Sequence, residues 1–155
     1  MKKVSIIFFL MILILTGCEN KEEETKNEYI SMKSNLLEEE KYTDISNLPI
    51  DITVKIDRID EERVKYKVIL NKPKENMKNI KALVVHNYYN EELYSSVGFF
   101  DDSRNLLAQD EESSIELSNT IKTTKNLSKI NLELKLWLEY INDEGEKKEI
   151  YYKTT

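Results

Sequence analysis

The stretch INLELKLWLEYI, Ile130 to Ile141, carries the clearest pattern in the chain. Apolar and polar side chains alternate through it at a spacing of two, the repeat at which successive side chains of a β-strand point to opposite faces. An α-helix would scatter these residues around its axis, so the pattern predicts a half-buried strand. The side chains expected to face the core are Ile130, Leu132, Leu134, Leu136, Leu138 and Tyr140, and those expected on the other face are Asn131, Glu133, Lys135, Trp137, Glu139 and Ile141.

Short strand-like segments with polar turns between them fill the chain on both sides of this stretch. Asp60-Glu61-Glu62 predicts one tight hairpin, and the turn from Asn142 to Glu146 predicts another. Pro73 marks the end of a strand, because proline cannot donate to a central ladder. The other predicted strands are residues 52–56, 64–70, 80–89, 93–100, 115–121 and 149–153.

About seven short strands without a long helix between them favour an all-β fold, an antiparallel β-sandwich, over residues 42–155. The arrangement is similar to an immunoglobulin-like domain, without the paired cysteines of antibody domains. This likeness concerns the fold and implies no function.

Residues 18–41 differ from residues 42–155 in their charge and in the spacing of their apolar residues. Their first part is a run of acidic residues without apolar content, which predicts a solvated tether. Thr25 to Glu28 matches a capping box, and apolar residues then recur at helical spacing, so a short amphipathic helix is predicted over about Lys26 to Lys41. Such a helix either grips a partner, packs on its own domain or serves as a stalk.

The first eighteen residues have the layout of a secretory leader. Lys2 and Lys3 precede an apolar run from Val4 to Leu15, which is too short to span a bilayer core that needs about 20 residues. Leu15-Thr16-Gly17-Cys18 resembles the lipobox of bacterial lipoprotein signal peptides of the Gram-positive type. The resemblance implies that residues 1–17 are removed and that Cys18 receives a diacylglyceryl group. It places the protein at the extracytoplasmic face of the cell membrane, held there by lipid. The alternative is an uncleaved anchor or a buried helix.

Charge excludes one class of partner. The formal charge is −6, and it becomes −8 once Lys2 and Lys3 leave with the leader. Nucleic acid is bound by clustered Lys and Arg, so we expect no nucleic-acid partner.

The sequence offers little for catalysis. His86 is the only histidine in the sequence, which excludes a metal site with several histidine ligands. Cys18 is the only cysteine, so no Cys/His nucleophile pair remains once Cys18 is lipidated. A glycine-flanked nucleophile serine, a glycine-rich phosphate loop and a zinc-protease motif are all missing from the sequence. We therefore expect a protein that is not an enzyme and uses no cofactor, with His86 as an ordinary strand residue.

One segment has the spacing of a calcium loop. Asp101, Ser103, Asn105 and Glu112 fall at positions 1, 3, 5 and 12 of such a loop. Against calcium, Leu106 occupies the position that needs glycine, and the flanks are predicted strands rather than helices. The alternative is a solvated loop between strands, and no metal is assigned.

An aromatic cluster is the second candidate site. Its members lie on two neighbouring predicted strands, where alternation sends some side chains outward to bind a protein, a peptide or a glycan and others into the core. The residues are Tyr88, Tyr89, Tyr94, Phe99 and Phe100.

Two classes of function remain open at this stage. The first is a membrane-anchored cell-surface module that binds an envelope or extracellular protein without catalysis. The second is an accessory or structural subunit of an envelope assembly without a ligand of its own. A cell-wall-directed enzyme is a more distant alternative.

Overall fold

The computed structural model describes residues 23–87, 96–110 and 112–154. The chain divides into two compact units, Met1–Met32 and Lys33–Thr155. The described part of the first unit is helical, and the helix over residues 23–38 ends inside the second unit. It lies about three residues N-terminal to the predicted range. None of the helical segments in the described ranges is long and apolar enough to cross a membrane.

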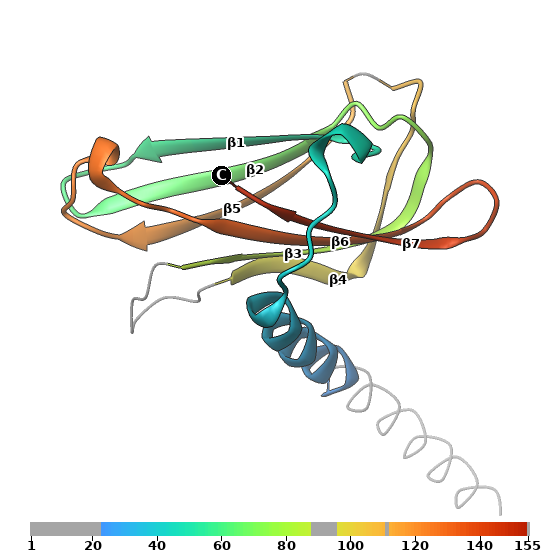
Figure 1. Cartoon of the computed structure of the whole chain (residues 1–155), viewed down its shortest axis with the longest axis horizontal. Coiled ribbons are helices and arrows are strands. Elements are labelled where there is room, and N and C mark those ends of the chain that lie inside the picture. The colour runs from blue at the N-terminus through green and yellow to red at the C-terminus, as the bar shows by residue number, and fades with distance from the viewer. Residues whose placement is uncertain (1–22, 88–95, 111, 155) are drawn as a thin grey trace, which may run out of the picture. The chain divides into compact units, whose positions relative to one another are not determined.

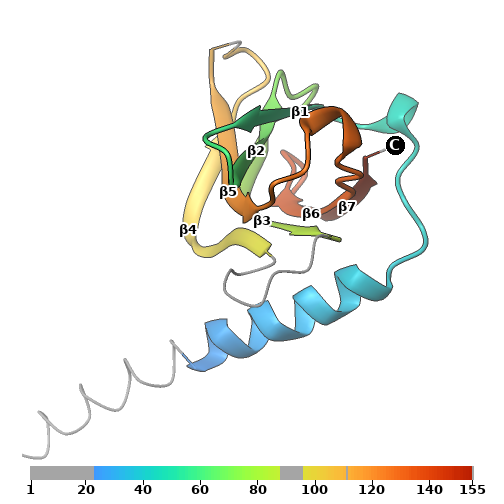
Figure 2. The same ribbon diagram turned by 90° about the vertical axis from the view of Figure 1, so that its left-hand side faces the viewer.

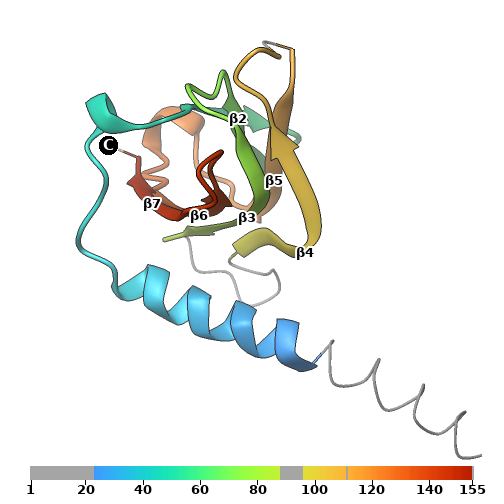
Figure 3. The same cartoon turned by 90° about the vertical axis from the view of Figure 1, so that its right-hand side faces the viewer.

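Two antiparallel sheets face each other in the second unit, so the predicted all-β sandwich is confirmed (Figure 1). One sheet has the strand order β1-β2-β5 and the other β4-β3-β6-β7. The pairs β2–β5 and β3–β6 join strands that are not consecutive, which is the Greek-key connection of immunoglobulin-like sandwiches. The end-on views show the two layers from opposite ends (Figures 2 and 3). The strands are β1 (Asp51–Arg58), β2 (Arg63–Asn71), β3 (Met77–His86), β4 (Ser96–Leu106), β5 (Ser114–Lys122), β6 (Leu134–Ile141) and β7 (Lys147–Lys153).

Both predicted hairpins are present. The β1–β2 connection closes where the Ile59 amide donates to the Arg63 carbonyl at 2.9 Å. In the β6–β7 turn the Asn142 side chain accepts the amide of Glu146 at 2.9 Å, and Gly145 has a φ of 79°, which a residue with a Cβ rarely adopts. Local turn chemistry thus fixes the pairing of each hairpin.

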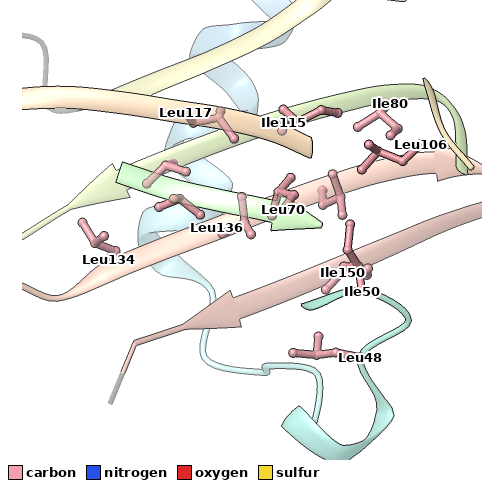
Figure 4. Close-up of a cluster of buried hydrophobic side chains, with 14 of the residues drawn as sticks. Leu48, Ile50, Leu70, Ile80, Leu106, Ile115, Leu117, Leu134, Leu136 and Ile150 are labelled. Atoms are coloured by element: carbon pink, nitrogen blue, oxygen red, sulfur yellow. The ribbon is translucent and has the colours of Figure 1, made fainter. Parts of the chain in front are cut away.

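The core lies between the inner faces of the two sheets (Figure 4). Every second residue of β2 points into it, and so do the predicted inward residues of β6 from Leu134 to Tyr140. The core also holds Leu48 and Ile50, which precede β1. The alternation that predicted the strands therefore also identified most of the core.

The strand predicted over Ile130 to Ile141 is shorter in the structure than the alternating pattern in the sequence. A 3₁₀ helix, η2 (Leu127–Lys129), comes just before it, and β6 begins only at Leu134. Ile130 and Leu132 still pack, partly buried, against the core. The alternation of apolar residues indicates which side chains are buried, and here burial against the core begins before the hydrogen-bonded part of the strand.

Trp137 lies on the outer face of the four-stranded sheet and is nonetheless completely buried. Its ring stacks on Phe100 with centroids 5.8 Å apart. Leu83 and Val85, on the same face of neighbouring β3, are also buried outside the main core. The four-stranded sheet thus buries apolar side chains on both faces.

Candidate functional site: a groove along the open edge of the sandwich

The segment of residues 42–50 runs along one lateral side of the sandwich, from edge strand β7 to the start of β1 (Figure 3). Its first part is held to β7: the Thr43 amide donates to the Tyr151 carbonyl at 2.7 Å, and the Tyr151 amide donates to the Thr43 hydroxyl at 3.4 Å. This pairing also covers part of an edge strand that would otherwise be open to other chains.

A capped turn follows in this segment. The 3₁₀ helix η1 (Ile45–Asn47) begins after Asp44, whose carboxylate accepts the Ser46 amide at 2.9 Å and the Ser46 hydroxyl at 2.8 Å. These hydrogen bonds hold the pKa of Asp44 below its ordinary value. The cap fixes the direction in which Ile45 projects.

Two hollows flank this turn, with volumes of about 460 Å³ and 230 Å³. Ile45 and Tyr152 line both, so the two hollows adjoin, and we call them together the edge groove. The larger hollow is also lined by Tyr42, Thr43, Asp44, Lys153 and Thr154, and the smaller by Leu48, Ile50, Asp51, Ile52, Thr53 and Lys74.

Ile45 is the most exposed of the large apolar side chains in the described ranges, at 63%. Single exposed apolar residues are ordinary on protein surfaces. Ile45 differs because it stands on a capped turn between two hollows with aromatic walls. An apolar side chain presented in this way is suited to contact with a partner.

The Tyr42 wall of the edge groove is itself held in place. Its hydroxyl donates to the Glu39 carbonyl, and the ammonium groups of Lys135 and Lys153 each lie 5.9 Å from its ring centroid, in cation–π range. Lys153 also forms an ion pair with Glu133 at 2.8 Å, and this hydrogen bond raises the pKa of Lys153. The larger hollow therefore has a rigid aromatic wall and a cation at its rim.

The edge groove has the composition of a recognition site. Six of its thirteen lining residues are isoleucine, leucine or tyrosine and three are threonine, with Asp44, Asp51, Lys74 and Lys153 as the charged members. The sequence had not singled it out. The available signal was an isoleucine inside the polar run Thr43 to Asn47, but only the fold brings Tyr152 beside it.

The aromatic cluster predicted from the sequence is described only in part. Tyr88, Tyr89 and Tyr94 lie outside the described residues. Phe99 packs against the core with the Arg104 guanidinium 4.1 Å from its ring centroid, while Phe100 stacks on Trp137 on the other face. These two phenylalanines pack on opposite faces of the sheet and do not form one surface.

The calcium-loop segment is largely strand. Asp101, Ser103 and Asn105 fall within β4, which continues to Leu106 instead of ending near Phe100. Asn105 accepts the backbone amide of Asn79 at 2.9 Å, and Glu112 lies in the turn that follows, where its amide donates to Asp110. Within the described ranges no group of three or more His, Cys, Asp or Glu side chains could hold a metal ion.

His86 is a strand residue, as predicted, and it is buried. It ends β3, and its ring meets the Tyr66 ring edge to face with centroids 5.6 Å apart. Cys18, the predicted lipidation site, lies outside the described residues.

Comparisons with known proteins add two distant structural likenesses. No family model matches the chain, and no curated protein matches it. A crystal structure described as that of the putative ApaA protein from Bordetella pertussis is similar over 68% of this chain and 92% of its own, with 12% identity and a TM-score of 0.43. The sporulation control protein Spo0M from Bacillus subtilis covers 68% of this chain and 48% of its own, with 11% identity and a TM-score of 0.27.

Proposed function

We propose that this chain is an extracytoplasmic lipoprotein, anchored in the cell membrane through Cys18, and that its sandwich is a non-catalytic module that binds an envelope or extracellular protein. The leader, the lipobox-like tetrapeptide and the acidic tether support the anchor and the location. The binding role is supported by a surface of the sandwich, the edge groove.

The edge groove is the observation that carries the binding role. An exposed apolar side chain beside hollows with aromatic walls can become buried at the centre of a protein interface, where the residues that contribute most to binding cluster. The larger hollow, at about 460 Å³, lies within the usual size range of ligand sites, and its lining is mostly apolar. The partner we propose presents an apolar side chain to the groove beside Ile45 and Tyr152.

Crosslinking on intact cells, followed by mass spectrometry, tests this function. We expect the wild-type protein to be joined to one protein partner, and Ile45→Asp to lose that product because a carboxylate at the centre of the interface would be desolvated. Ile59→Asp is the matched control, since Ile59 is also exposed, at 48%, and does not line the groove. Equal crosslinking of wild type and Ile45→Asp, or equal loss in both variants, would contradict the assignment of the groove.

A further inference from the structure

The outer face of the β1-β2-β5 sheet collects positive charge in a chain that is acidic overall. Arg63, Lys65 and Lys67 occupy alternate positions of β2, so all three side chains point away from the core-facing residues between them. Lys55 lies opposite Lys67 on β1, and Lys122 lies opposite Arg63 on β5. We call these five side chains the cationic face.

Acidic side chains neutralise this face in part, and one of them is Asp51, opposite Asn71 on the outer side of β1. Asp57 is opposite Lys65 in the register, Glu116 forms an ion pair with Lys67 at 3.1 Å, and Asp60 forms one with Arg63 at 2.6 Å. Lys55 and Lys65 have no ion pair within the described part of the chain. The remaining neighbours on β5 are hydroxyl side chains, Ser118 opposite Lys67 and Thr120 opposite Lys65.

Two like-charged pairs on this face oppose folding. Like charges directly opposite each other on neighbouring strands are destabilising, and this applies to Lys55 opposite Lys67 and to Arg63 opposite Lys122. In the absence of a ligand, such pairs do not stabilise the sheet. An anion lying across the rows would turn both repulsions into attractions.

The net charge of the whole chain does not decide local binding. Charges separated by more than the Debye length, about 8 Å at physiological ionic strength, are largely screened from each other. The acidic tether, residues 19–40, contributes much of the negative charge in sequence, and the cationic face is contributed by three paired strands. The net charge of the whole chain therefore does not exclude an anionic polymer from this face.

We infer that the cationic face binds a linear, phosphate-bearing polymer. Alternate positions of a strand lie about 6.6 Å apart, so the β2 row presents evenly spaced cations to successive phosphates of an extended chain. Lys55 and Lys122 extend the row sideways, and Ser118 and Thr120 supply hydroxyl donors between the cations. The inference is independent of the edge groove, which lies along the β1–β7 side and shares none of these residues.

Binding of long-chain inorganic polyphosphate to the full chain in neutral detergent, measured at several salt concentrations, tests the inference. We expect log K to fall linearly with log salt, because each neutralised phosphate contributes a slope of about −0.7. The double variant Lys55→Gln with Lys65→Gln removes two phosphate contacts. It should make the slope of log K against log salt less steep by about 1.4, and it should weaken the affinity on the order of tenfold at 0.1 M salt. The same double variant should melt at the same or a higher temperature, since it removes repulsion.

Matched controls separate this site from net charge and from the edge groove. Lys41→Gln with Lys129→Gln makes the same change in charge at exposed residues outside the face and should leave polyphosphate binding unchanged, as should Ile45→Asp. Equal loss in both lysine double variants, or no loss in either, would overturn the inference. Binding to anionic phospholipid vesicles through Lys55 and Lys65, without binding to polyphosphate, would also overturn it and would assign the face to the membrane surface.

Discussion

The burial of Trp137 on the outer face of its sheet gives a prediction whose size follows from the structure. Trp137 is 0% exposed. A buried tryptophan removes roughly 150–250 Å² from water, which corresponds to about 4–6 kcal/mol at 25 cal/mol per Å². Because alanine keeps the Cβ and the site relaxes in part, we expect Trp137→Ala to lower the free energy of unfolding by about 3–5 kcal/mol.

The phenylalanine variant separates packing from hydrogen bonding at the same position. Trp137→Phe keeps a ring against Phe100 and removes an indole N–H that is buried without an acceptor among the described residues. An unsatisfied buried donor costs about 1–3 kcal/mol, so its removal offsets much of the lost contact, and we expect a net cost of about 1 kcal/mol.

Urea unfolding followed by far-ultraviolet circular dichroism measures both variants, since neither retains a tryptophan to report by fluorescence. A cost under about 1 kcal/mol for Trp137→Ala would show that this face is not packed. A phenylalanine variant as unstable as the alanine variant would show that the indole N–H makes an essential hydrogen bond.

Three further perturbations test the fold. Leu134→Ala removes a core side chain at the start of β6 and should cost about 2–5 kcal/mol in the same assay; a neutral effect would mean that the register of β6 is off by one residue. Gly98→Ala would place a Cβ 2.5 Å from the Ala82 carbonyl oxygen, so we expect a loss of about 1–3 kcal/mol, and an unchanged thermal midpoint would contradict this contact. Hydrogen bonds from Lys78 and Asn76 lower the pKa of Asp143 below 3.8. Because its folded pKa is the lower one, its contribution to stability is complete above the unfolded pKa of about 4 and is lost as the pH falls through the folded pKa. Asp143→Asn should therefore flatten the acid limb of the stability curve below about pH 4, and an unchanged limb would exclude this linkage.

Alternation predicted the sandwich because burial on one side of a strand leaves a two-residue repeat in the sequence. The alternation correctly predicted which side chains of β2 and β6 face the core. It left the other face of β6 undecided, where Lys135 and Glu139 suggest solvent and Trp137 between them is buried. A repeat of two cannot reveal what covers a sheet from outside, because that depends on segments distant in sequence.

Lys135 illustrates the same limit at a single residue. Its pattern predicts a solvated side chain, yet its ammonium donates to the carbonyls of Leu37 at 2.6 Å and Glu39 at 3.1 Å. The edge groove was missed for a related reason. Ile45 and Tyr152 are more than a hundred residues apart, and neither belongs to a motif of adjacent positions. The cationic face was likewise hidden, since its residues come from three strands and only the register brings them together.

The proposed function depends first on the lipid anchor, because an interaction module of the cell surface must be held there. Mass spectrometry of the N-terminal peptide of the protein purified from membranes tests this most directly. The account predicts a peptide that begins at Cys18 and carries a diacylglyceryl group, and a Cys18→Ala protein that leaves the detergent phase. An N-terminal peptide that still contains Gly17 joined to an unmodified Cys18 would contradict it.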